Sequence, residues 1–109
     1  MQPAELIASA REQDVLNAVF ALQLYNARDA WRSPEQGKID VHRALDDAFP
    51  PGEIDDALAR SDTLIGDAKD VAFGEWHADQ HLRELAARHP GFTAEHVRDA
   101  LSWGYYNAR

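Results

Sequence analysis

The residues best suited to chemistry are two histidines and a glutamate, His77, His81 and Glu84. Residues three or four apart share one face of an α-helix, so a helix through this stretch would align these side chains over two turns. Two imidazoles and a carboxylate are suitable ligands for zinc or another first-row divalent ion. The glutamate that follows the first histidine of a metalloprotease helix is replaced by Ala78. The spacing therefore predicts either a divalent-metal site, completed by ligands from elsewhere in the chain, or a solvated polar face of the helix.

The chain also carries a strongly one-sided charge. Its net charge is −8, and the segment 46–79 holds ten of the 19 acidic residues against only Arg60 and Lys69, so this segment accounts for the whole imbalance. A field of this size repels nucleic acid and anionic lipid, and it attracts cations and basic proteins. The segment contains no loop with the alternating oxygen ligands and the sharp glycine turn of an EF-hand, which excludes that kind of calcium site.

A basic protein partner is the interpretation that this charge favours, and direct nucleic-acid binding is disfavoured. The carboxylates that would steer the encounter are Asp46, Asp47, Asp55, Asp56, Asp62, Asp67 and Asp70. Electrostatic complementarity of this kind raises the rate at which an inhibitor meets a basic target. The alternative is a solvated acidic face that contributes only to solubility.

Aromatic side chains supply candidate anchors for such a partner. Trp103, Tyr105 and Tyr106 surround Gly104 within about one helical turn, so the three rings cannot all face one core. Trp31 is a similar candidate in the first predicted helix. Trp and Tyr are favoured anchors in protein interfaces. We expect these rings either to contact a partner or a second copy of the chain, or to be wrapped internally by the helices of the domain.

Enzymatic chemistry has weaker support in the sequence. The serines stand in no Gly-x-Ser-x-Gly motif or phosphate-binding loop. Adjacent carboxylates such as Asp55 and Asp56 point about 100° apart on a helix and are poorly placed to share a proton. The chain has no cysteine, which excludes disulfides and thiolate metal sites. The sequence thus favours a non-enzymatic protein, with no cofactor other than the divalent metal of the alternative above.

Length and composition indicate one ordinary globular domain over residues 1–109, 45% of which are hydrophobic. The first ten residues lack the basic start and the apolar run of a signal peptide. No apolar run approaches the roughly 20 residues that a membrane-spanning helix needs. We therefore expect a cytoplasmic protein that does not enter the membrane.

Helices must position all of these side chains, because apolar residues recur with helical spacing and no segment alternates with the period of a strand. The helices are expected over residues 3–32 with a bend near residues 11–14, and over residues 40–48, 53–60, about 62–88 and 93–109. Proline corners at residues 50–52 and 89–91 separate the later ones. The predicted fold is all-α, a single domain of about five helices in which a long N-terminal helix packs against two helix–Pro–helix hairpins.

Capping and glycine positions add detail to this prediction. Asp40 and Thr93 are expected N-caps. The run Ser61-Asp62-Thr63 offers cap candidates for the fourth helix. Gly66 and Gly74 each cost about 1 kcal/mol relative to alanine inside a helix. They therefore indicate either close packing against a neighbour or a break near Gly74.

One short stretch resembles a known family. Residues 89–101, with the sequence HPGFTAEHVRDAL, are similar to the closing helix–turn–helix of small bacterial antitoxins of the VapB type. The resemblance covers about 13 of the 109 residues, and the extended N-terminal part of that family has no counterpart here. It implies a local helix–turn–helix geometry. The operator binding that it would also imply is disfavoured by the acidic segment.

The function predicted from the sequence is that of a small acidic, non-enzymatic interaction module of the inhibitor, immunity, antitoxin or adaptor type, which binds a basic protein surface. One alternative is a divalent-metal-binding helical protein, hydrolytic or not, that uses His77, His81 and Glu84. The other is a structural homodimer without a small ligand.

Overall fold

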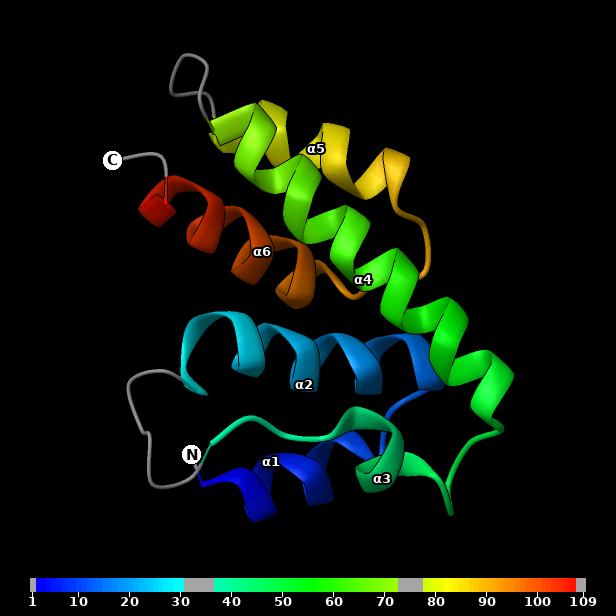
Figure 1. Ribbon diagram of the computed structural model, residues 1–109. Helices are drawn as coiled ribbons and strands as arrows, with labels where there is room; N and C mark the ends of the chain where they lie inside the picture. Colours follow the sequence, from blue (N-terminus) through cyan, green and yellow to red (C-terminus); the bar gives the residue numbers. More distant parts are fainter. Residues whose placement is uncertain (1, 31–36, 73–77, 108–109) are drawn as a thin grey trace. The chain divides into compact units, whose positions relative to one another are not determined.

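The computed structural model describes residues 2–30, 37–72 and 78–107, and these residues form helices and no strand (Figure 1). The helices are α1 (Pro3–Ala10), α2 (Val15–Arg28), α3 (Val41–Leu45), α4 (Pro51–Ala72), α5 (Ala78–Arg88) and α6 (Ala94–Asn107). The predicted all-α class is confirmed. The chain falls into two compact units, Met1–Ser61 and Asp62–Arg109, with the boundary inside α4. A single domain over residues 1–109 stays a prediction.

The predicted long first helix is two helices, α1 and α2. Residues 11–14 form a turn, in which the amide of Glu12 donates to the carbonyl of Ser9 and that of Gln13 donates to Ala10. These residues are all polar, so no apolar side chain continues the buried stripe through them. Asp14 then has the extended backbone of an N-cap and begins α2. The expected bend is therefore a complete break, which raises the number of described helices to six.

The core residues of the N-terminal unit belong to α2, α3 and the first half of α4. Among them, Phe20, Leu22, Leu45 and Ile54 are completely buried. The predicted cap of α3 is confirmed, because the Asp40 carboxylate accepts a hydrogen bond from the amide of Arg43 at 3.2 Å. The helix ends at Leu45, three residues earlier than predicted, and residues 46–48 form a turn.

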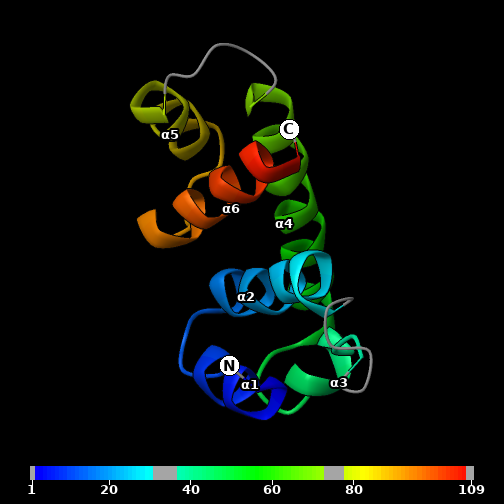
Figure 2. The same ribbon diagram turned by 90° about the vertical axis from the view of Figure 1, so that its left-hand side faces the viewer.

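Residues 51–72 form one helix, α4, where the sequence analysis predicted the end of one helix and the start of another (Figure 2). That prediction was wrong because Ser61 does not cap a helix but occupies a completely buried interior position. The buried positions 54, 57, 61, 64, 65 and 68 follow helical spacing without a gap, so burial favours continuing the helix through the polar residues 61–63. The predicted break near Gly74 lies outside the described residues.

The C-terminal unit contains the second half of α4 with α5 and α6, and α5 and α6 pack side by side (Figures 1 and 2). The corner between them includes Gly91, whose φ of 96° is a conformation that favours glycine. The predicted cap of α6 is confirmed, because the amide of His96 donates to Thr93 Oγ1 at 3.2 Å. At Gly104, α6 lies so close to α4 that a Cβ atom would stand 2.5 Å from the carbonyl oxygen of Ala68.

Candidate interaction surfaces

Two of the three predicted metal ligands, His81 and Glu84, lie within the described residues. His81 is 8% exposed, and its Nδ1 lies 2.7 Å from the Tyr105 hydroxyl on α6. Glu84 accepts a hydrogen bond from the Gln80 amide at 3.0 Å. His77 lies outside the described residues, and those that are described contain no group of three histidine, aspartate or glutamate side chains able to hold a metal ion. The metal site with His77, His81 and Glu84 stays a prediction.

The contact between His81 and Tyr105 joins α5 to α6 inside the C-terminal unit. The two ring centroids are 5.9 Å apart. Burial raises the pKa of the Tyr105 hydroxyl. The hydroxyl therefore stays protonated at neutral pH and remains available to the imidazole nitrogen. This arrangement satisfies two polar groups beneath the surface, which identifies His81 first as a structural residue.

In the N-terminal unit, the predicted steering carboxylates Asp46, Asp47, Asp55 and Asp56 are all exposed. Arg11 Nη2 donates to Asp47 Oδ2 at 2.7 Å. This hydrogen bond holds the pKa of Asp47 below its ordinary value and raises that of Arg11. His42 Nε2 lies 2.7 Å from Asp55 Oδ1.

In the C-terminal unit, Asp62 and Asp70 are exposed, whereas Asp67 has a different environment. Its Oδ2 lies 2.7 Å from Nε2 of His89, a side chain that is 9% exposed. The ring of His89 also meets Phe92 edge-on. Sequence spacing gave no signal for this contact, because 22 residues separate Asp67 from His89. Asp67 therefore holds the corner after α5 in addition to contributing charge.

The acidic side chains of α4 gather on its exposed side. Asp55, Asp56, Asp62 and Asp70 are exposed, while the buried positions of the same helix face the opposite way. A helix turns through about 100° per residue, so seven-residue spacings such as Asp55–Asp62 keep side chains on the same side. Among the basic residues of this helix, Lys69 is exposed and Arg60 is half-buried. The four aspartates are called the α4 acidic face below.

The glycines of α4 also lie on its exposed side. A Cβ atom at Gly52 or at Gly66 would meet nothing within 4 Å. Neither glycine is therefore required by packing within the described residues, although Gly66 stands in the helix interior. The close packing that the sequence analysis allowed for Gly66 occurs instead at Gly104.

The predicted aromatic anchors differ in how exposed their side chains are. Trp103 is buried, and its ring stacks on that of Tyr106 with centroids 5.2 Å apart. Tyr106 is 49% exposed, and Tyr105 is half-buried against His81. Trp31 lies outside the described residues. Among the described rings, Tyr106 is therefore the one with the most surface available to a partner.

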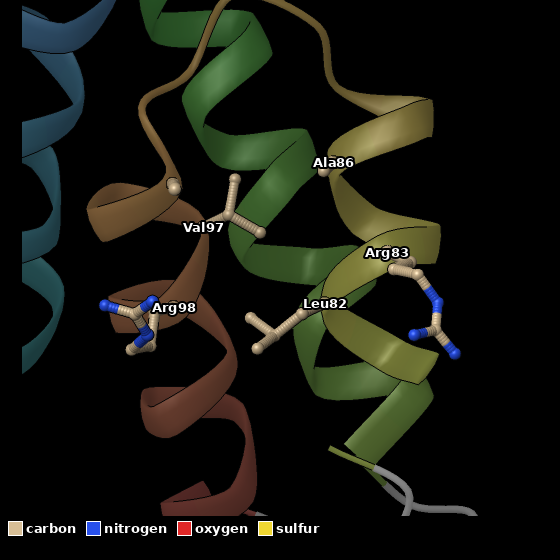
Figure 3. A pocket seen from close by; sticks show the side chains of 6 residues that line it. Leu82, Arg83, Ala86, Val97 and Arg98 are labelled. Carbon is tan, nitrogen blue, oxygen red and sulfur yellow. The ribbon is translucent and has the colours of Figure 1, made fainter. Parts of the chain in front are cut away.

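A groove that the sequence analysis did not foresee lies between α5 and α6. Its volume is about 270 Å³, and its lining residues are Leu82, Arg83, Ala86, Ala94, Val97 and Arg98 (Figure 3). The lining combines apolar side chains with two arginines. The apolar spacing of each helix was visible in the sequence, but the pairing of the two helices was not.

No described helix has both the length and the apolar character that crossing a membrane requires. Comparisons of the chain with protein-family models, with curated proteins and with solved structures give no match. The resemblance of residues 89–101 to an antitoxin family therefore assigns no family, and a functional conclusion has to come from the surfaces themselves.

Proposed function

We propose that this protein is a small, non-enzymatic interaction module whose α4 acidic face binds a basic surface of a partner protein. The observation that carries the proposal is the exposure of Asp55, Asp56, Asp62 and Asp70 on one side of a continuous helix. A helix of 22 residues is about 33 Å long, which is enough to present its charges to a partner helix or loop.

The charge of this face favours a fast, steered encounter. Three of the predicted steering carboxylates already have a partner within the protein: Asp47 contacts Arg11, Asp55 contacts His42 and Asp67 contacts His89. Asp56 and Asp70 form no ion pair within the described residues, so their charge is available to a partner. Oppositely charged surfaces raise association rates by about 10- to 1,000-fold, and salt reduces this gain.

The small residues of the exposed side favour close approach by that partner. Gly52, Ala59 and Gly66 recur every seven residues along it. A glycine in a helix interior costs about 1 kcal/mol relative to alanine, and nothing within the described residues occupies the space over Gly66. A partner backbone could approach the helix closely at these points and place its basic side chains against the flanking aspartates.

The test measures association of a synthetic arginine-rich helical peptide at low and at physiological salt. In one variant Asp56→Lys and Asp70→Lys reverse two charges of the α4 acidic face. The matched control, Glu5→Lys with Glu12→Lys, reverses two exposed carboxylates of the N-terminal segment and changes the net charge equally. We expect the α4 variant to lower the association rate at least tenfold and to flatten its salt dependence.

The control variant should lower the association rate less than threefold. Equal losses in both variants would mean that the peptide responds only to the net charge of the protein, and would contradict binding at the α4 acidic face. An unchanged rate in the α4 variant would remove the steering claim altogether. Circular dichroism and thermal melts of both variants establish that each remains folded.

A further inference from the structure

The groove between α5 and α6 has an apolar centre. The side chains of Leu82 and Val97 point into the space between the two helices (Figure 3). Val97 is buried and Leu82 is half-buried. Ala86 and Ala94 complete the apolar lining, and both are exposed. Their methyl side chains are too short to fill the groove, so it remains open along one side of this helix pair.

The two arginines of the groove stand on different helices. Arg83 belongs to α5 and Arg98 to α6, and their guanidinium groups lie on either side of Leu82 and Val97 (Figure 3). Both side chains are exposed, and neither forms an ion pair within the described residues. Carboxylates lie one turn away on the same helices, at Asp79 and Glu95, but among the described residues no ion pair joins them to the two arginines.

We propose that this groove receives an amphipathic helix of a partner protein, one that carries an apolar stripe flanked on both sides by acidic residues. Helix-in-groove binding uses apolar anchors at i, i+3 or i+4 and i+7, which match an open apolar groove between two helices. One cation on each side of the groove complements a helix with carboxylates on both flanks of its stripe. A single-headed anion such as a fatty acid would engage only one of the two arginines.

This surface is distinct from the α4 acidic face in both position and sign. The groove selects acidic helices, whereas the α4 acidic face selects basic ones. The protein would then bring two oppositely charged partners together, as an adaptor does. The two proposals rest on different residues, so either can fail while the other stands.

The test uses a fluorescent synthetic helical peptide with leucines at i, i+4 and i+7 and glutamates on both flanks. A second peptide has every glutamate replaced by lysine, and sodium decanoate serves as a small amphiphile. Binding is followed by fluorescence anisotropy, and the methyl resonances of Leu82 and Val97 report its location by NMR. The variants are Arg83→Glu with Arg98→Glu, and the bulky, uncharged Ala86→Gln.

The matched control is Arg88→Glu, made singly and compared with Arg83→Glu made singly. Arg88 is an exposed arginine of α5 that does not line the groove. We expect the acidic peptide to bind the unmodified protein and to shift the Leu82 and Val97 methyl resonances. Reversing Arg83 and Arg98 together should weaken binding at least tenfold, Ala86→Gln should weaken it severalfold, and Arg88→Glu should change it less than twofold.

Four results would overturn the proposal. The first is no binding of the acidic peptide, and the second is equal binding of the basic peptide at the same methyl groups. The third is decanoate binding in the groove without peptide binding, which would indicate a lipid-like ligand. The fourth is a concentration-dependent dimer that shifts the same methyl groups and is abolished by Ala86→Gln, which would assign the groove to a second copy of the chain. None of these results bears on the α4 acidic face.

Discussion

Each of the two units of the chain contains a histidine 2.7 Å from an aspartate, but the two pairs lie at different depths. In the N-terminal unit, the side chains of His42 and Asp55 are 43% and 70% exposed. In the C-terminal unit, those of His89 and Asp67 are 9% and 34% exposed. The same interatomic distance therefore describes a surface contact in one unit and a buried structural contact in the other.

Distance alone does not rank the interactions of this protein. Water competes for exposed ion pairs, so they contribute little to stability. Buried polar groups depend on their partners, because an unsatisfied group keeps its full desolvation penalty. The C-terminal unit also contains the close approach at Gly104. We therefore expect substitutions in its interior to be more damaging than substitutions in the surface contacts of the N-terminal unit.

The largest loss in the free energy of unfolding is expected for Gly104→Ala. The new Cβ atom would lie 2.5 Å from the carbonyl oxygen of Ala68 and 2.8 Å from its carbonyl carbon. Both are backbone atoms, so relief requires α4 and α6 to move apart. Overpacking of this kind costs about 1–3 kcal/mol, and we expect the upper part of that range. Urea unfolding measures the change in free energy of unfolding.

Gly66→Ala is the matched control for this substitution, because Gly66 is also a helical glycine but faces open space. Alanine is the better helix former there and should raise the free energy of unfolding by up to about 1 kcal/mol. If Gly104→Ala lowers the free energy of unfolding and Gly66→Ala raises it, the result supports a packed helix surface at Gly104 and an open one at Gly66. Stabilisation by Gly104→Ala would show that α6 does not approach α4 as described.

The next prediction compares His89→Ala with His42→Ala, and we expect an intermediate loss of stability only for His89→Ala. His89→Ala removes a mostly buried hydrogen bond to a carboxylate and should lower the free energy of unfolding by about 1–2 kcal/mol. His42→Ala removes an exposed contact and should change it by less than about 0.5 kcal/mol. Urea unfolding at neutral pH compares the two variants directly. Equal changes would contradict the distinction between the two contacts.

The smallest effect concerns Arg11 and Asp47, whose side chains are 40% and 61% exposed. The hydrogen bond from Arg11 lowers the pKa of Asp47 in the folded protein. The Asp47 carboxylate therefore stabilises the folded protein above the pKa that Asp47 has in the unfolded chain, near 4. This stabilisation is lost as the pH falls through the lower pKa that Asp47 has in the folded protein. In Arg11→Ala, NMR titration should show the Asp47 pKa rising towards its ordinary value, while Arg43→Ala leaves it unmoved. A pKa unchanged by Arg11→Ala would exclude the contact in solution.

Much of the secondary structure could be predicted from local signals. The apolar spacing identified the helices, and the caps at Asp40 and Thr93 formed where capping chemistry placed them. The same signals failed at Ser61, because serine favours a cap only where the chain is free to turn. There the buried row of α4 continues through the position, and tertiary burial overrides the local preference.

The features of the candidate surfaces also fall into those that local signals predict and those that depend on the fold. Composition and spacing along the chain are enough to predict the helical class, the −8 charge and the confinement of that charge to the segment 46–79. Three features became visible only in the folded chain: four aspartates share the exposed side of α4, Asp67 contacts His89, and Arg83 and Arg98 flank an apolar groove. Each of these features depends on how far a helix continues or on which helices pack together, and short-range spacing carries no information about either.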